Sequence, residues 1–159
     1  MARQPRSPVT SVDPRQIVVT ATPGAEGEAA VEAALAIAAR SDAEVVFLRV
    51  APPVEYRYFR GAPPRPLLRR LFHGGDAVLD EAAARAWEEG VPFRRERVAG
   101  DPAEAILDCA DDVDADLIVI GQRSRWGGSS LARRVRRRTS RPVLVARSVG
   151  DAEGRQVAA

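Results

Sequence analysis

Residues 98–121 read VAGDPAEAILDCADDVDADLIVIG, and they predict a helix followed by a buried strand. Asp101 followed by Pro102 is typical of a helix start, because aspartate caps free N–H groups and proline suits the first turn. The predicted helix carries an apolar stripe at helical spacing, made of Ile106, Cys109, Ala110 and Val113. Residues 116–121 (DLIVIG) then form a short β-branched run, which predicts a strand buried on both faces.

The same alternation extends in both directions along the chain. Further strands are predicted at residues 16–21 (QIVVTA), 44–50 (EVVFLRV), 92–98 and 142–147 (PVLVAR), and further helices at 25–39, 76–89 and 130–139. Strands that alternate with helices pair in parallel through right-handed crossovers, so the sequence predicts a three-layer α/β domain with an open parallel sheet. The strand at 92–98 begins with proline and is rich in arginine, which favours a position near a sheet edge.

The predicted domain covers residues 16–148. Residues 1–15, with three prolines and no periodic pattern, and residues 149–159 are predicted to be flexible tails. Residues 51–75 interrupt the alternation with a segment rich in proline, glycine and arginine, in which we expect a short helix at 66–72. Such a segment is either a binding loop or a variable surface connection, and we favour the connection.

The composition excludes several classes of catalytic and metal site. The chain has 159 residues and a mass of 17.1 kDa, its 24 basic residues are all arginine, and it has one histidine (His73) and one cysteine (Cys109). Without lysine there is no Walker A lysine and no lysine nucleophile, and one histidine leaves no His-based metal cluster or catalytic dyad. No apolar run is long enough to cross a membrane, and residues 1–8 (MARQPRSP) lack a signal-peptide pattern. We therefore expect a cytoplasmic protein that is not an enzyme and holds no metal.

Charge is strongly segregated although the net charge is only +2. Residues 76–116 hold 13 acidic residues and 4 arginines, a balance of −9, whereas residues 117–147 hold 9 arginines and no acid, a balance of +9. Either these charges meet as solvated faces around one domain, or the basic side attracts phosphate or another anion. Helical spacing spreads the arginines of residues 133–141 around their helix, and no aromatic residue is interleaved with them. We expect no nucleic-acid partner; these arginines can pair with the acidic helices or face a protein partner.

Three segments that follow predicted strands are the candidate ligand site. In an open parallel sheet, ligands bind beyond the carboxyl ends of the strands, where the strand order reverses. The segments at this edge are 20–24, 50–53 and 121–130. The last reads GQRSRWGGSS and runs into a helix, so its glycines would let backbone N–H groups approach an anion and its serines can bind phosphate. The same residues also mark an ordinary strand-to-helix turn, which leaves both interpretations open.

Four strings together resemble the universal stress protein domain: residues 98–106 (VAGDPAEAI), 116–121 (DLIVIG), 130–135 (SLARRV) and 141–147 (RPVLVAR). The resemblance covers roughly residues 15–148. It implies a Rossmann-like, adenine nucleotide α-hydrolase-like fold with five parallel strands in the order 3-2-1-4-5, in a bacterial stress-response protein. It also implies a homodimer joined through the last strand, at Val143, Leu144 and Val145.

Many members of this family bind ATP at the switch point between the first and fourth strands. For this chain the resemblance implies a nucleotide or anion site made by Thr20, Thr22, Val50, Gly121, Arg123, Ser124, Ser129 and Ser130. The family's ATP fingerprint is glycine, two residues, glycine, nine residues, glycine, then serine or threonine.

The sequence departs from that fingerprint. Gly121 matches the first glycine, but Ser124 and Ser129 stand at the second and third, with only four residues between them instead of nine. Thr22 stands where ATP-binding members usually have an aspartate. We therefore expect weak or lost ATP binding and a non-enzymatic, dimeric regulatory module. The alternative is a nucleotide-binding protein that holds ATP or another phosphate ligand in the loop 121–130.

Three single residues are given structural roles. Trp87 is predicted to pack on the core side of the helix at 76–89, and Cys109 is predicted to be a small buried side chain. Trp126 lies in the shortened loop, where we expect its indole to fill the space that an adenine occupies in other members.

Overall fold

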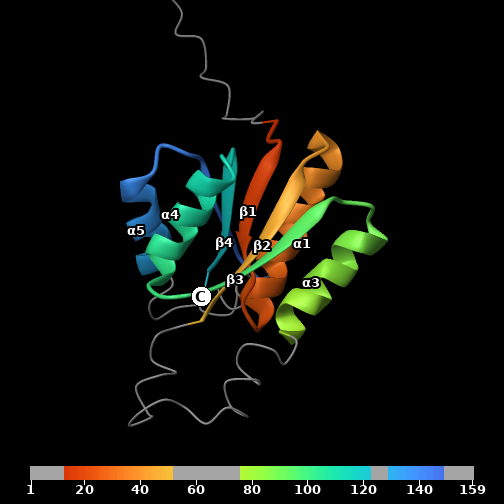
Figure 1. Cartoon of the computed structure of the whole chain (residues 1–159), viewed down its shortest axis with the longest axis horizontal. Coiled ribbons are helices and arrows are strands. Elements are labelled where there is room, and N and C mark those ends of the chain that lie inside the picture. The colour runs from red at the N-terminus through yellow and green to blue at the C-terminus, as the bar shows by residue number, and fades with distance from the viewer. Residues whose placement is uncertain (1–12, 52–75, 123–128, 149–159) are drawn as a thin grey trace, which may run out of the picture.

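The computed structural model describes residues 13–51, 76–122 and 129–148 (Figure 1). Within them the elements follow the order β1 (Gln16–Thr20), α1 (Ala25–Ser41), β2 (Glu44–Ala51), α3 (Ala77–Glu88), β3 (Phe93–Ala99), α4 (Pro102–Asp112), β4 (Leu117–Gly121), α5 (Ser129–Arg138) and β5 (Val143–Ala146). Each strand and helix predicted in these ranges is present, with ends that differ from the prediction by at most two residues. The expected helix at 66–72, most of both predicted tails and Trp126 lie outside the described residues. None of the helices in the described ranges is both long and apolar enough to span a bilayer.

The five strands form one parallel sheet. β1 pairs with β2 on one side and with β4 on the other. β3 then pairs with β2, and β5 pairs with β4. The strand order is β3-β2-β1-β4-β5, which confirms the predicted open sheet and the order 3-2-1-4-5. The arginine-rich strand β3 lies at one edge, as its composition predicts, and β5 lies at the other.

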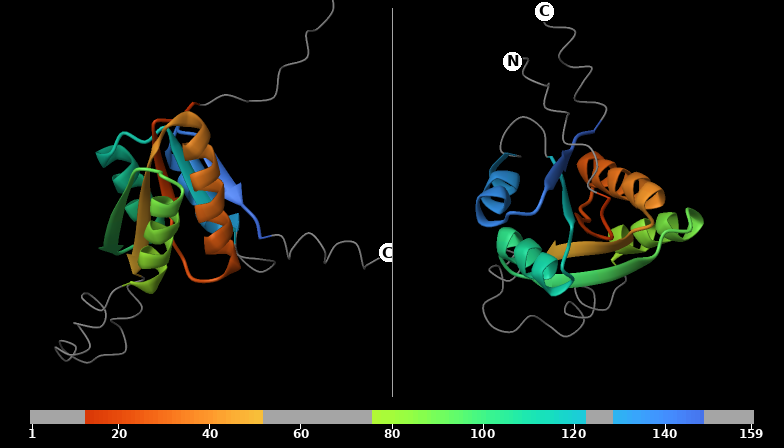
Figure 2. Two further views of the ribbon diagram at one scale, coloured as in Figure 1. Left: turned by 90° about the vertical axis from the view of Figure 1, so that its right-hand side faces the viewer. Right: turned by 90° about the horizontal axis from the view of Figure 1, so that it is seen from above.

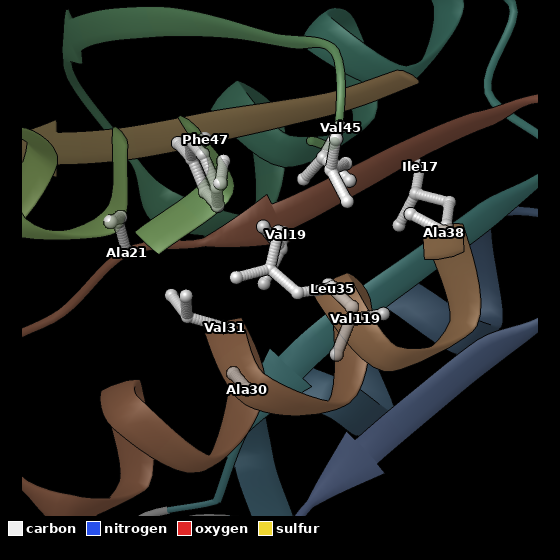
Figure 3. Close-up of a cluster of buried hydrophobic side chains, with 14 of the residues drawn as sticks. Ile17, Val19, Ala21, Ala30, Val31, Leu35, Ala38, Val45, Phe47 and Val119 are labelled. Atoms are coloured by element: carbon white, nitrogen blue, oxygen red, sulfur yellow. The ribbon is translucent and has the colours of Figure 1, made fainter. Parts of the chain in front are cut away.

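Helices cover both faces of the sheet, so the molecule has three layers (Figure 2). Successive residues of β1 divide between two cores: Ile17 and Val19 face α1 and α3, whereas Val18 faces α4 and α5. Figure 3 shows the first core, in which Val31 of α1 faces the strands that carry Val19 and Phe47. Because both faces are covered, the central strands are apolar at successive positions rather than at alternate ones.

The second core confirms most of the predicted helix faces. α4 buries Ile106, Cys109 and Ala110, as its stripe predicts. α5 buries Val135 fully and Ala132 almost fully. Both helices therefore turn their small or branched residues toward the sheet and leave their charged residues outside.

Asp76 joins the start of α3 to two strands. Its Oδ1 accepts hydrogen bonds from the backbone N–H groups of Val78 (3.2 Å) and Leu79 (3.4 Å), so Asp76 caps the helix. Its Oδ2 lies 3.3 Å from Nε of Arg49 on β2 and 3.8 Å from Nε of Arg97 on β3. The three side chains are mostly buried, with 11%, 22% and 27% of the Asp76, Arg49 and Arg97 side chains exposed.

The other predicted helix ends are also present. Asp101 accepts a hydrogen bond from the backbone N–H of Glu104 (3.1 Å), and Pro102 occupies the first turn of α4. Gly90 follows α3 with φ of 69°, a left-handed conformation that glycine adopts without a steric penalty.

The prediction that Trp87 packs toward the core is wrong, because Trp87 is 80% exposed. The buried face of α3 is made of Leu79, Ala82, Ala83 and Ala86. Each residue turns about 100° around an α-helix, so the position after Ala86 falls outside this stripe. The size and hydrophobicity of the indole suggest burial, but the spacing of the small residues decides which face is buried.

Candidate functional site

The strand order reverses between β1 and β4, which lie side by side in the middle of the sheet. The chain leaves β1 toward α1 on one face and leaves β4 toward α5 on the other. The carboxyl ends of these strands are where open parallel sheets bind ligands, so this switch point is the candidate site. Thr20 ends β1 and is only 6% exposed, Thr22 lies half-buried in the following turn, and Gly121 ends β4.

The structure therefore brings three of the predicted site residues to the switch point. Val50 lies one strand away on β2, partly buried against the second core. Ser129 and Ser130 are the first residues of α5. Arg123 and Ser124 lie outside the described residues.

The first turn of α1 packs tightly against both loops at the switch point. A Cβ atom at Gly27 would lie 1.8 Å from the carbonyl oxygen of Thr22, and a Cβ atom at Gly121 would lie 2.4 Å from the carbonyl oxygen of Glu26. Both sites need glycine because of this close approach, since neither has a positive φ. Sequence reasoning missed Gly27 and Glu26. The available signal was a glycine inside an alanine-rich helix, where alanine is the better helix former.

The turn after β1 also borders α3. A cavity of about 50 Å³ lies between the turn after β1, α1 and α3, whereas pockets for small molecules have roughly 300–1,000 Å³. A Cβ atom at Gly24 would lie 3.1 Å from Oε2 of Glu26, so the Glu26 carboxylate lies over the start of α1. The positive end of the α1 dipole therefore already has a negative charge from the protein itself.

A second hollow, of about 550 Å³, runs between α5 and β5. We call it the arginine groove, and it is lined by Gln122, Ala132, Arg133, Arg136, Arg137, Leu144, Val145 and Arg147. The Arg136 guanidinium donates a hydrogen bond to the carbonyl oxygen of Val143 (3.1 Å), and Nε of Arg147 donates to Oε1 of Gln122 (3.0 Å). None of the described residues that line this groove is acidic.

The segregated charges meet outside that groove. One guanidinium nitrogen of Arg134 lies 2.9 Å from both carboxylate oxygens of Asp101, and Arg141 lies 2.6 Å from Asp111. The hydrogen bond from Arg134, together with that from the backbone N–H of Glu104, lowers the pKa of Asp101. These pairs confirm the prediction that arginines on the basic side pair with the acidic helix α4.

A third hollow, of about 390 Å³, lies between α4 and β3. Among the described residues, its charged lining residues are all acidic: Glu96, Asp101, Glu104, Asp108 and Asp112. Cys109 also lines it as a buried free thiol, which confirms the predicted burial. Burial raises the pKa of the Cys109 thiol to about 11, and the negative charges of Glu96 and Asp112 add to the effect. The thiol is therefore neutral at physiological pH.

We expect Cys109 to react with iodoacetamide on the order of 100-fold more slowly in the native protein than in urea at pH 8, because raising its pKa from 9.0 to about 11 removes most of the reactive thiolate. Mass spectrometry of timed samples measures both rates on the same single cysteine. The raised pKa of Cys109 also makes the free energy of unfolding depend on pH. The contribution of the neutral thiol is fully present below pH 9.0 and is lost as the pH rises toward about 11. Similar rates in both states would contradict the burial of the thiol.

Comparisons with known proteins agree with this geometry. The sequence model of the universal stress protein family matches residues 14–147. A solved structure of a protein from this family in Burkholderia pseudomallei is 29% identical, with a TM-score of 0.69 and coverage of 85% of this chain and 97% of that chain. A universal stress protein in complex with cAMP is 28% identical, with a TM-score of 0.63 and coverage of 84% and 97%.

The fold extends to a more distant relative. A universal stress protein family protein from Arabidopsis thaliana with AMP bound is 21% identical, with a TM-score of 0.64 over 87% of this chain and 94% of its own. No curated protein sequence matches the chain. The family match spans all five strands of the 3-2-1-4-5 sheet together with the switch point between β1 and β4. The chain therefore belongs to the universal stress protein family.

Proposed function

We propose that this chain is a non-enzymatic, dimeric regulatory module of the bacterial cytoplasm that acts in the stress response and has weak or lost ATP binding. The observation that carries the proposal is the packing of the first turn of α1 against Thr22 and Gly121. In this packing the backbone of the first turn of α1 lies directly against both loops at the switch point. The departures from the ATP fingerprint at Ser124 and Ser129 support the same conclusion.

The chemistry of the site supports a protein that binds rather than catalyses. Thr20 and Thr22 bring hydroxyl groups to the switch point, and a hydroxyl becomes a good nucleophile only beside a general base. The chain has no lysine, and its one histidine, His73, lies outside the described residues. We therefore propose that the chain works through its ligands or partners and not through a reaction.

The edge strand β5 supports a homodimer. β5 is the last strand of the sheet and is only four residues long. Leu144 is 38% exposed, and Val143 and Val145 are partly buried. An exposed strand edge favours pairing with another chain, and pairing with the same strand of a second copy would cover it. We propose that these three residues form the dimer interface.

The alternative function is nucleotide binding by the loop 121–130. The relative that was solved in complex with cAMP favours it, since it is 28% identical over most of both chains. The site would then be made by Thr20, Thr22, Val50, Gly121, Arg123, Ser124, Ser129 and Ser130. Backbone N–H groups, the guanidinium and the serine hydroxyls would hold a phosphate group there.

A thermal-shift titration with Mg-ATP, ADP, AMP and cAMP tests the proposal, with sodium sulfate as the control for bulk anions. A nucleotide present at 100 times its dissociation constant would stabilise the native state by about 2.7 kcal/mol, a rise in Tm on the order of 8 °C. We expect no nucleotide to raise Tm beyond the effect of sulfate. A rise specific to one nucleotide would overturn the proposal in favour of the alternative.

A further inference from the structure

We propose that the arginine groove binds an acidic, extended segment of a partner protein, which adds to β5 as a further strand and displaces the second copy of this chain. The proposal rests on the proposed dimer in one respect only: both use the open edge of β5. It goes further by stating the chemistry of the partner and by making the dimer the state that the partner replaces.

The charge of the groove identifies the partner as acidic. Four of its lining residues are arginines, at positions 133, 136, 137 and 147, and all four are exposed. Neighbouring arginines that have acidic partners, Arg134 and Arg141, make their ion pairs with α4 and not in the groove. Several guanidinium groups without a carboxylate among the described lining residues repel one another, and an anionic partner relieves that repulsion and gains charge-assisted hydrogen bonds.

The backbone of β5 identifies the partner as an extended chain. The N–H groups of Ile118 and Gln122 on the β4 side donate to the carbonyl oxygens of Pro142 (3.0 Å) and Ala146 (2.8 Å). The backbone groups of the even-numbered residues of β5 therefore point toward β4, and those of Val143 and Val145 point to the open edge. A strand that pairs there satisfies these groups by main-chain hydrogen bonds, whatever its side chains.

Arg136 belongs both to the positive charge of the groove and to the open edge of β5. Its guanidinium donates to the carbonyl oxygen of Val143 (3.1 Å), which is one of the groups that an added strand would use. When a backbone N–H of the partner takes this carbonyl, Arg136 is released to pair with a carboxylate. The hydrogen bond from Arg136 thus satisfies this carbonyl until a partner strand binds. Only a strand with acidic side chains both replaces that hydrogen bond and gives the released Arg136 a new partner.

The two faces of β5 fix the pattern of the partner. Val143 and Val145 pack with the core under α5, whereas Ala146 belongs to the core under α1, so Leu144 lies on the α1 face. A paired strand therefore places every second side chain beside the arginines of α5 and the intervening ones beside the exposed Leu144. The pattern that fits is an alternation of acidic and apolar residues.

Two other occupants fit the groove less well. A second copy that pairs through β5 brings a second set of the same arginines to the interface, so like charges face each other. A nucleic acid has no N–H and C=O ladder for the strand edge, and none of the described lining residues is aromatic for a base to stack on.

Binding of two synthetic peptides tests the partner's chemistry. The probe is a fluorescent octapeptide of alternating Glu and Val with blocked ends, and its control has Gln in place of every Glu. Fluorescence anisotropy at 50 mM and 300 mM NaCl is expected to show that the Glu peptide binds at least tenfold more tightly than the Gln peptide, with the difference reduced at high salt. Equal binding of the two peptides would overturn the role of the arginines.

Variants of the protein locate the binding. The double variant Arg133→Gln/Arg137→Gln is expected to weaken binding of the Glu peptide at least tenfold. The matched control is Arg40→Gln/Arg138→Gln, which removes the same charge from exposed arginines outside the groove. Equal losses in the two double variants would show a general effect of charge and would overturn the proposal.

Backbone N-methylation tests strand addition without changing the protein. Two further Glu peptides carry N-methyl groups on the odd-numbered or on the even-numbered residues, so that one edge or the other is blocked. Because alternate N–H groups of an extended chain point the same way, we expect one of the two peptides to bind like the parent and the other to lose binding. Binding by both would overturn strand addition.

Sedimentation velocity separates this proposal from the proposed dimer. We expect a dimer without peptide and a complex of one chain with one peptide after addition of the Glu peptide. A monomer that binds the peptide would refute the dimer and leave the acidic partner standing. A dimer that the Glu peptide does not dissociate would overturn the displacement. A single-stranded deoxythymidine decamer that binds more tightly than the Glu peptide would overturn the proposal in favour of nucleic acid.

Discussion

Replacement of Gly27 by alanine is expected to lower the free energy of unfolding by about 2–3 kcal/mol. The new Cβ atom would lie 1.8 Å from the carbonyl oxygen of Thr22, so either the turn after β1 or the helix α1 must move. Both are held in place: the N–H of Ala21 donates to the carbonyl oxygen of Leu48 (2.8 Å), and Ala30 in the next turn of α1 is fully buried. Neither side of the contact is the flexible end of a side chain, which is why the cost is large.

The sign of the effect distinguishes this contact from helix propensity. Alanine is a better helix former than glycine by about 1 kcal/mol, so without the contact the same change would stabilise the protein. Urea unfolding followed by circular dichroism measures the difference in the free energy of unfolding. The control is Glu28→Ala, at the neighbouring, exposed position of the same helix. We expect it to change the free energy of unfolding by less than about 0.5 kcal/mol. A Gly27→Ala protein that is as stable as the parent, or more so, would contradict the close packing at the switch point.

The sheet could be predicted from the sequence because its central strands are short runs of apolar residues that are buried on both faces. Residues 117–120 and 17–19 are apolar at every position, and only a strand covered on both faces needs that pattern. The start of α4 could be predicted because the Asp101 cap is a contact between neighbours in sequence. Signals of this kind are local, and the structure confirms them within at most two residues.

The details of the site could not be predicted because they depend on contacts between distant segments. Gly121 at the end of β4 lies against Glu26 in the first turn of α1, and nothing near either residue in the sequence indicates the other. The pairing of Arg134 with Asp101 also joins residues of different helices, although the charge pattern favours some pairing of this kind. The prediction for Trp87 is wrong for a different reason, because the local stripe of small residues, and not the size of the indole, decides which face of α3 is buried.

Replacement of Asp76 by alanine is expected to lower the free energy of unfolding by about 3 kcal/mol, the sum of a lost helix cap and a lost ionic contact to two mostly buried arginines. The cap serves Val78 and Leu79, and such caps contribute about 1 kcal/mol. The remainder comes from the arginines. Nε of Arg49 is buried without a hydrogen-bond partner among the described residues, and the carboxylate 3.3 Å away compensates its charge.

Two further variants separate these contributions in the same unfolding experiment. Asp76→Asn keeps an N-cap oxygen but removes the charge, so it is expected to lose about 2 kcal/mol, the ionic part alone. Asp80→Ala removes the contact to Arg95 at a site where both side chains are more than half exposed, and exposed pairs contribute less than about 1 kcal/mol. If Asp76→Asn is as stable as the parent, the arginines of β2 and β3 do not need this carboxylate, and the cap alone explains any loss in Asp76→Ala. If it loses as much as Asp76→Ala, the charge carries the whole effect, and the start of α3 is held by its ion pairs with the sheet rather than by its cap.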